Sequence, residues 1–351
     1  MRTLHFALPG SIERRTGGTI YDRRIVEGLR ARDWSVVVYE MGGRYPIVDD
    51  EALSAAEAVL ARAGRPLVID GLALPAFRLA ARPLAVGRGI VALVHHPLAE
   101  ETGLAPAAAA MLRQAERADL GRVDGAIVTS AFTAGILARD FDVAPERIAA
   151  VVPGTLPPFQ KRPQPRAGDR PVRLLSVAAV VPRKGHRLLL EALQRLRGLP
   201  WDLVCIGQTT RDRGLMESLI KFIVDNDLED QVHFMGEVED AVIVDCLATA
   251  DLFVHAADFE GYGMALAEAL KVGLPVVAVA GGAVPEVVPP TAGLLCPPGD
   301  VEALATALQR MIRDPSLRRR MASGAAAAGA ALPNWATAAG RFAAALDRLV
   351  P

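Results

Sequence analysis

The chain has 351 residues, three cysteines and a formal net charge of −1. This length is enough for two domains with large cores, and the balance of 39 basic against 40 acidic residues gives no reason to expect nucleic acid as a partner. The cysteines are widely spaced among apolar neighbours and form no CxxC pair, which predicts buried thiols in a cytoplasmic protein. No apolar run approaches the roughly 18 residues of a membrane-spanning helix. No transmembrane segment is therefore expected, while peripheral membrane contact stays open.

The first part of the chain alternates between strand-like and helix-like segments. Short apolar runs predict strands, and apolar residues at helical spacing predict helices. The predicted strands are 4–8, 36–39, 66–70, 90–94, 125–129 and 148–152. The predicted helices are 20–29, 50–62, 75–81, 106–118 and 130–139. This alternation indicates a parallel sheet covered on both faces, with ligands at the carboxyl ends of its strands.

Residues 153–171 contain six prolines and no periodicity, which predicts an interdomain linker. The alternation then restarts. The second set of predicted strands is 172–177, 202–206, 232–235, 252–254 and 275–280. The second set of predicted helices is 187–196, 215–226, 241–248, a helix opening near Gly263, a start at Pro285, 301–312 and 335–349. The chain is thus an α/β protein with two Rossmann-like halves.

The loop and helix that hold Glu260 and Glu268 carry the most chemical information. Gly261 and Gly263 open the helix and bare its backbone N–H groups, and such a helix start attracts phosphate. A carboxylate beside an anion would repel it, so each glutamate is expected to accept hydrogen bonds from hydroxyl groups. The pattern therefore predicts a ligand that is phosphorylated in the middle and polyhydroxylated at both ends, as a nucleotide-sugar is.

Five motifs support a family resemblance. In chain order they are Thr16-Gly17-Gly18, Pro182-Arg183-Lys184-Gly185, Glu260-x7-Glu268, Gly281-Gly282-Ala283-Val284-Pro285-Glu286 and Pro297-Pro298-Gly299-Asp300. Together they resemble the retaining glycosyltransferases with the two-domain GT-B fold, most clearly from about residue 172 to 312. The resemblance implies two doubly wound parallel-sheet domains facing across a cleft. Residues 1–160 would form the acceptor-side domain, 161–334 the nucleotide-sugar donor domain, and the last helix, 335–351, would pack back on the first.

The resemblance also implies roles for single residues. The expected catalytic residues are Glu260, which orients the hydroxyls of the donor sugar, Lys184, the cation for the diphosphate, and His95, which faces the donor sugar. Glu268 would hold the ribose. The other residues expected to bind the donor nucleotide are Gly17, Gly18, Arg183, Gly207, Gly236, Gly261, Tyr262, Gly263, Met264, Ala265 and Gly282.

Several of these assignments have competitors. His96 is the alternative to His95, because adjacent strand residues point to opposite faces. The family usually has an arginine where this chain has Ala179, and Arg183 is the candidate for the missing charge. Glu286 fits equally a helix-start acid and a site residue, and His186 and His255 are interpreted as structural.

The expected function is retaining transfer of a hexose from a UDP- or GDP-linked glucose or mannose donor to an unknown hydroxyl acceptor, in glycan, glycolipid or polysaccharide assembly. The resemblance implies front-face displacement, in which the departing phosphate oxygen helps to deprotonate the acceptor. No metal and no cofactor are expected, because no DxD-like carboxylate pair follows a predicted strand. The alternatives are a non-catalytic GT-B protein that binds a nucleotide-sugar or glycan, and an NAD-dependent oxidoreductase. The latter would need a GxGxxG motif in a first βα turn, and neither half has one.

Overall fold

The computed structural model describes residues 2–80, 89–101, 104–155 and 170–350. The chain divides into two compact units. Unit 1 comprises Met1–Gly154 together with Pro333–Pro351, and unit 2 comprises Thr155–Leu332. The predicted domain boundary at residue 160 and most of the predicted linker lie outside the described residues.

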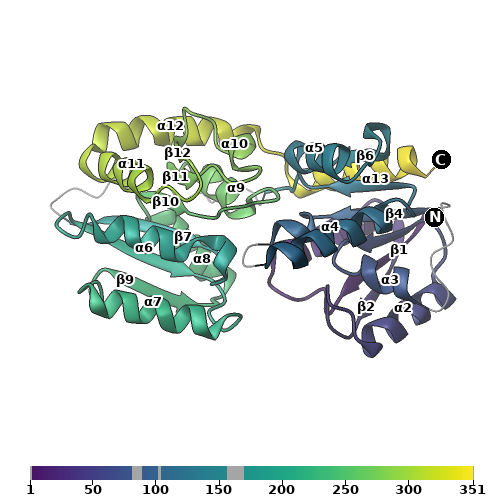
Figure 1. The fold of residues 1–351 in the computed structure, drawn as a ribbon. Helices are drawn as coiled ribbons and strands as arrows, with labels where there is room; N and C mark the ends of the chain where they lie inside the picture. The colour runs from purple at the N-terminus through teal and green to yellow at the C-terminus, as the bar shows by residue number, and fades with distance from the viewer. Residues whose placement is uncertain (1, 81–88, 102–103, 156–169, 351) are drawn as a thin grey trace. The chain divides into compact units, whose positions relative to one another are not determined.

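Unit 1 is built on a six-stranded parallel sheet with the strand order β2-β1-β3-β4-β5-β6 in the described part of the chain (Figure 1). Its strands are β1 (Arg2–Pro9), β2 (Trp34–Met41), β3 (Leu67–Asp70), β4 (Ile90–Val94), β5 (Gly125–Val128) and β6 (Ile148–Ala150). Every residue of β3, β4 and β5 is buried, as expected for central strands covered on both faces. The six strands predicted for this half of the chain are confirmed.

Helices flank this sheet. They are α1 (Gly17–Arg30), α2 (Asp50–Arg62), α3 (Leu74–Leu79), α4 (Pro106–Leu120), α5 (Ala131–Asp140) and α13 (Trp335–Leu349), with short 3-10 turns at η1 (Leu98–Glu100) and η2 (Pro145–Arg147). Ser130 caps α5 by accepting a hydrogen bond from the Thr133 N–H. Gly17 and Gly18, expected just before a helix, are instead the first two residues of α1.

Unit 2 repeats the architecture with a sheet ordered β12-β11-β10-β7-β8-β9, parallel throughout the described residues. Its strands are β7 (Val172–Val177), β8 (Trp201–Ile206), β9 (Val232–Gly236), β10 (Leu252–His255), β11 (Val276–Val279) and β12 (Gly293–Cys296). The last of these was not predicted. Its four residues include no β-branched side chain, so the segment carries little strand propensity of its own.

The helices of unit 2 include one long segment that the sequence only partly indicated. They are η3 (Pro182–Lys184), α6 (His186–Gln194), α7 (Arg213–Asp225), α8 (Asp240–Thr249), α9 (Met264–Lys271), α10 (Val284–Val287), α11 (Val301–Arg313) and α12 (Pro315–Ala331). The sequence has a helix-prone, alanine-rich tract at 322–331, but the Asp314 side chain accepts hydrogen bonds from the Ser316 and Leu317 N–H groups, and the helix begins at Pro315, seven residues before that tract. Helix α12 packs against α9, and α11 packs against α6.

Helix α13 follows unit 2 in the sequence but belongs to unit 1, where it packs against α1 and β5. Its buried face consists of small and apolar residues at helical spacing: Ala338, Ala339, Phe342, Ala345, Leu346 and Leu349. Phe342 is among the largest fully buried side chains of the described residues. The core of unit 1 is therefore closed by the C-terminal segment of the chain.

We expect Phe342→Ala to lower the free energy of unfolding of unit 1 by about 3–5 kcal/mol, since it leaves a cavity beneath α13. The measurement is denaturant unfolding followed by tryptophan fluorescence, because Trp335 begins the same helix. The neighbouring Arg341 is exposed, and Arg341→Ala is the matched control. Equal stability of the two variants would show that α13 contributes little to the core.

Candidate active site

The candidate residues lie at the carboxyl ends of strands, where the strand order of each sheet changes direction. In unit 1, β1 is flanked by β2 and β3, and in unit 2, β7 is flanked by β8 and β10. Within each sheet, the strands on the two sides of the central strand are reached by connections that run in opposite directions. In open α/β sheets, ligands bind in the crevice at such a point. The predicted residues follow β1 and β4 in unit 1, and lie at or after the ends of β7, β8, β9, β10 and β11 in unit 2.

In unit 2 the structure brings Glu260 and Lys184 into direct contact. Glu260 follows β10, and its side chain is only 9% exposed. Its Oε1 accepts a hydrogen bond from Lys184 Nζ and lies 2.7 Å from His255 Nε2. His255, which the sequence suggested to be structural, is thus a member of this cluster. The predicted hydroxyl-binding carboxylate is already paired with the predicted diphosphate-binding cation.

The electrostatic surroundings keep Glu260 ionised. Burial by itself would raise the pKa of Glu260, but Lys184, the hydrogen bond with His255 and the charge of Arg183 hold that pKa well below its usual range. Arg183 is fixed nearby, since its Nη1 donates a hydrogen bond to the Phe259 carbonyl at 2.8 Å. The cluster therefore presents a buried carboxylate together with two cations from the η3 turn.

A glycine turn holds the Glu260 backbone in place. The Ala283 N–H donates to the Glu260 carbonyl at 2.9 Å. Gly282 has φ +64°, and a Cβ added there would lie 2.2 Å from the Glu260 carbonyl oxygen. Only glycine combines this left-handed conformation with so close a contact. Gly282 therefore positions the loop of Glu260 by packing against it.

Helix α9 begins directly after this loop. Gly263, with φ +100°, is its N-cap and has no side chain that could accept a hydrogen bond from the first turn. The first intrahelical bond runs from the Ala267 N–H to the Gly263 carbonyl, so the N–H groups of Met264 and Ala265 precede the hydrogen-bonded ladder. Glu268 is the fifth residue of the helix and is half-buried. Donors suited to an anion thus lie between the two glutamates in the chain.

The other predicted residues of unit 2 lie in neighbouring loops. Gly207, after β8, donates its N–H to the carbonyl of Gly236, at the end of β9, at 2.9 Å. Gly261 is buried, and so is Tyr262, whose pKa is raised to about 12 by burial and then by Glu286. Glu286 itself is exposed at its place in α10.

In unit 1 the structure brings together Gly18 and His95, which are far apart in the sequence. His95 directly follows β4, and Gly18 is the second residue of α1. A Cβ added at Gly18 would lie 3.0 Å from His95 Cδ2. A side chain at position 18 would therefore push against the imidazole. An added Cβ at Gly17 would meet no atom within 4 Å.

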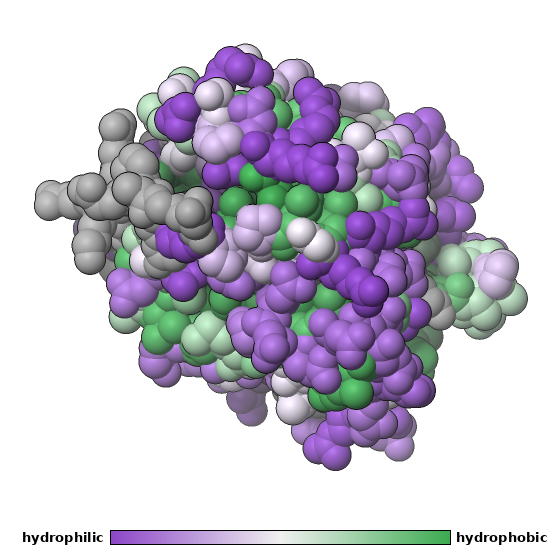
Figure 2. All heavy atoms as spheres, turned by 90° about the vertical axis from the view of Figure 1, so that its left-hand side faces the viewer, coloured by the Kyte–Doolittle hydropathy of each residue, from purple (hydrophilic) through white to green (hydrophobic). Residues whose placement is uncertain are grey.

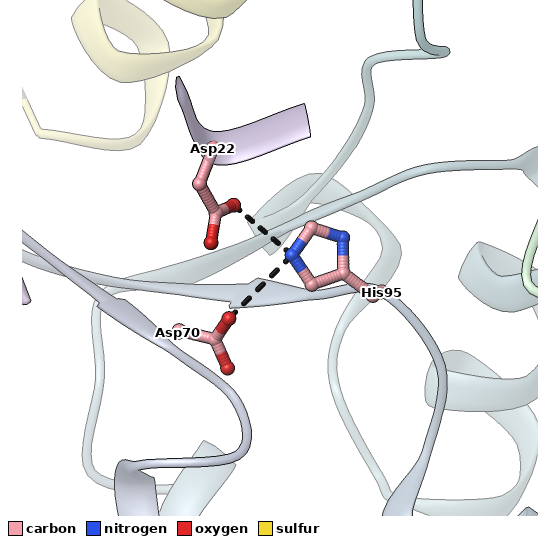
Figure 3. Close-up of side chains that lie close together, drawn as sticks. All are labelled: Asp22, Asp70 and His95. Carbon is pink, nitrogen blue, oxygen red and sulfur yellow. Dashed lines mark hydrogen bonds and ion pairs between the residues drawn. The ribbon is translucent and has the colours of Figure 1, made fainter. Parts of the chain in front are cut away.

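His95 is held between two carboxylates that sequence reasoning missed (Figure 3). Its Nε2 lies 3.0 Å from Asp22 Oδ1 and 3.6 Å from Asp70 Oδ2. Asp22 comes from α1 and is 1% exposed, and Asp70 is the last residue of β3 and is 7% exposed. A signal was present, because Asp22 occupies the same stripe of α1 as the buried Ile25 and Leu29.

The charges of this cluster depend on one another. Burial by itself would lower the pKa of His95, but Asp22 and Asp70 raise it to about 10. Burial raises the pKa of Asp22 to about 7, against the opposing effect of His95. The three residues also form a group that could hold a metal ion, since their ligand atoms lie within 4.8 Å of one another.

His96, the alternative to His95, belongs to a different contact. Its Nε2 lies 3.3 Å from Glu101 Oε2, and its side chain is 25% exposed. It takes no part in the Asp22–His95–Asp70 cluster. Of the two adjacent histidines, His95 is the one that contacts both the end of β3, through Asp70, and the start of α1, at Gly18.

Part of the chain matches a known protein family. Residues 159–327 match the family described as glycosyl transferases group 1. This segment of the chain is therefore similar to that family. The chain is similar in sequence to the MMP alpha-(1->4)-mannosyltransferase of Mycolicibacterium hassiacum, with 27% identity over 76% of this chain and 66% of that protein. It is also similar to a GDP-mannose-dependent monoacylated alpha-(1-6)-phosphatidylinositol monomannoside mannosyltransferase of Corynebacterium glutamicum, with 33% identity over 44% of this chain and 41% of that protein.

Solved structures agree on the fold. The sucrose-phosphate synthase of Thermosynechococcus elongatus matches with a TM-score of 0.81 and 21% identity over 98% of both chains. The Anabaena protein HepE in complex with UDP-glucose matches with a TM-score of 0.77 and 18% identity over 99% of this chain and 100% of that chain. The GT-B prediction is thereby confirmed.

The chain spans about two thirds or less of the length of the curated relatives above. No helix among the described residues has both the length and the apolar character needed to cross a membrane.

The glycine turn beside Glu260 gives a prediction about stability. We expect Gly282→Ala to destabilise unit 2 by more than about 2 kcal/mol, because a left-handed alanine costs about 1–2 kcal/mol and the new methyl group also meets the Glu260 carbonyl. Gly299 has φ +73° with nothing within 4 Å of an added Cβ, so Gly299→Ala isolates the backbone cost. Thermal denaturation measures both variants. Equal losses would mean that the contact with Glu260 relaxes freely.

Proposed function

We propose that this protein is a retaining hexosyltransferase that moves glucose or mannose from a UDP- or GDP-linked donor to a hydroxyl group of a glycan, glycolipid or polysaccharide acceptor. The observation that carries the proposal is the ionised, buried Glu260 beside Lys184 at the switch point of unit 2, followed at once by the start of α9. The match of residues 159–327 to the group 1 glycosyl transferases and the similarity to mannosyltransferases support hexose transfer.

The donor diphosphate is proposed to bind the first N–H groups of α9 and the cations of the η3 turn. A helix start provides unpaired donors and a positive dipole end, which suit a phosphate. Lys184 and Arg183 would add full charges that stabilise the leaving group. In this proposal the protein's own cations carry the charge of the departing diphosphate, and no metal is required.

The two glutamates are proposed to hold opposite ends of the donor. Glu260 would accept hydrogen bonds from sugar hydroxyls, and Glu268 from the ribose. Because Lys184 and His255 both lie against Glu260 Oε1, they fix the carboxylate before the donor arrives. A group held in this way loses little entropy on binding. Retention would follow from front-face displacement, in which the departing phosphate oxygen takes the acceptor proton.

Binding and turnover together test the function. We would titrate the protein with UDP, GDP and NAD by calorimetry, and measure donor hydrolysis and transfer in parallel with UDP- and GDP-linked glucose and mannose. Binding of UDP or GDP with release of sugar supports the transferase. Tight nucleotide binding with no turnover on any donor would favour a non-catalytic binding protein. A preference for NAD would contradict both.

The role of Lys184 gives a kinetic prediction. Lys184→Ala should raise the donor KM and lower kcat by at least about tenfold, since a charge-assisted contact is worth about 1.5–3 kcal/mol. The matched control is Lys221→Ala, because Lys221 also pairs with a carboxylate, that of Asp225, but at the surface.

Loss of Lys184 also leaves Glu260 buried without its main counter-charge, which lowers stability. The double variant Lys184→Ala with Glu260→Gln should recover thermal stability without recovering donor binding. If the single variant keeps wild-type kinetics, Lys184 is not a donor ligand.

The two glutamates should separate binding from turnover. Glu268→Ala should weaken binding of the free nucleoside diphosphate by about 1.5–3 kcal/mol, the usual cost of a hydrogen bond to a charged group. Glu260→Gln should leave that binding nearly intact while it lowers turnover, because its partner would be the sugar. Calorimetry and initial rates measure the two effects, with Glu217→Ala, an exposed acid on α7, as control. Equal losses of nucleotide affinity in the two site variants would refute the assignment.

A further inference from the structure

The sheet of unit 2 ends at β12, which pairs only with β11 among the described residues. The carbonyls of Ala292 and Cys296 accept backbone hydrogen bonds from the two ends of β11. Successive residues of a strand direct their backbone groups to opposite sides, so the N–H and C=O groups of Gly293 and Leu295 point away from β11. We call these outward groups the β12 edge. An edge of this kind is a template for pairing with another strand.

An open cavity of about 710 Å³ lies between the β12 edge and one side of α11. Its lining is mostly apolar, and on α11 it includes the small residues Ala303, Thr306 and Ala307, which we call the α11 flank. Small side chains allow a second helix to approach closely. On the side of unit 2 where α11 lies, at the left of Figure 1, Figure 2 shows apolar residues at the surface between hydrophilic ones.

We propose that two copies of this chain associate through the β12 edge and the α11 flank, about a two-fold axis perpendicular to the sheet of unit 2. The two β12 strands would pair antiparallel, with Gly293 of each copy opposite Leu295 of the other. Each such pair exchanges both of its N–H···O hydrogen bonds. The two α11 helices would then lie side by side, antiparallel, on the same face of the joined sheet.

Charge complementarity identifies a second copy as the occupant. Within α11 the residues that line the cavity run from Glu302 to Arg310, and Thr306 lies midway between them. A two-fold axis beside Thr306 places Glu302 of each copy opposite Arg310 of the other. Helix α11 is acidic in its first turn and basic in its last. Two antiparallel copies therefore match opposite charges at both ends, as a self-complementary two-fold interface requires.

The charged groups at the two ends of the α11 flank can take part in this contact. Glu302 pairs with Arg195, but both side chains are largely exposed, and a surface pair of this kind contributes little. Arg310, Arg313 and Arg320 line a neighbouring cavity of about 270 Å³, where Asp314 is the one acid among the described lining residues. The basic end of α11 thus has surplus positive charge for an acid from a partner.

Antiparallel pairing leaves the candidate active site of unit 2 unobstructed. Glu260 and Lys184 lie in loops at the carboxyl ends of β10 and β7, which run parallel to β12 within one sheet. The two-fold axis turns the carboxyl ends of the two sheets in opposite directions. The two sites would therefore lie at opposite ends of the joined sheet, and association does not depend on the transfer reaction.

The test is the oligomeric state of the full-length protein, measured by analytical ultracentrifugation over a range of micromolar concentrations. The wild type should sediment as a dimer. Glu302→Arg and Arg310→Glu should each raise the dimer Kd by at least about tenfold, because like charges would then face each other at two places. The variant that carries both changes should recover the wild-type Kd, since it only exchanges the two charges.

Glu217→Arg is the matched control, because it makes the same change at an exposed acid on α7. It should leave the dimer Kd unchanged, and thermal denaturation checks that every variant is folded. A wild type that stays monomeric at all these concentrations would overturn the proposal and leave the β12 edge to a strand from another protein. A dimer that neither single charge reversal weakens would overturn the assigned surface.

A cysteine beside the proposed axis tests the geometry directly. Cys246 is the partly exposed thiol, so Cys246→Ser provides the background. In that background Thr306→Cys should be joined to its counterpart by a short bis-maleimide, which gives a covalent dimer on a denaturing gel. Lys221→Cys, at an exposed position on α7, should stay uncoupled. Coupling at Lys221→Cys but not at Thr306→Cys would contradict the two-fold arrangement.

The strand pairing has its own variant. Leu295→Pro removes an outward N–H and keeps the ladder with β11, because proline is tolerated on an edge strand where its nitrogen faces away from the sheet. It should weaken the dimer at least about as strongly as one charge reversal, since it breaks a hydrogen bond at two symmetric places. An unchanged Kd in folded Leu295→Pro would show that the strands do not pair.

Discussion

A carboxylate buried at the end of a parallel sheet stays ionised only if cations reach it, and the Glu260 site depends on this constraint. Desolvation of such a group costs several kcal/mol, and an attraction of similar size must offset it. The offset comes from a turn about 76 residues earlier in the chain, which delivers Lys184 and Arg183. The loops after β7 and β10 are thus tied together by charge as well as by the sheet.

Both units hold an ionisable group beside groups of opposite charge, with the signs reversed between the units. In unit 2 one carboxylate lies among cations, and in unit 1 one imidazole lies between carboxylates. In both, the group at the centre is charged by its neighbours and lies at the switch point of a doubly wound sheet. The folds set where these groups lie, and the neighbours set their charge. A substitution among the neighbours therefore changes the chemistry of a residue that is itself untouched.

The sequence was informative wherever a local pattern determined the structure. Strand β4, helix α2 and the glycine-opened helix α9 were predicted to within a residue or two, because periodicity and caps act over short distances. Strand β12 was missed because its four residues depend on pairing with β11 rather than on their own propensity. Asp22, Asp70 and His255 were missed because their roles arise from contacts between elements. Asp22 and His95 are 73 positions apart in the sequence. No local periodicity of a helix or strand relates residues so far apart.

The position of helix α13 has a consequence for the synthesis of the protein. Because α13 closes the core of unit 1, a chain that emerges from the ribosome cannot complete that unit until all of unit 2 has been made. Unit 2 is in effect an insertion within unit 1. The two points of insertion are neighbours in space, since an added Cβ at Gly154 would lie 2.4 Å from the Trp335 nitrogen. Unit 2 can therefore fold as a separate domain during synthesis, before the last helix of unit 1 has been made.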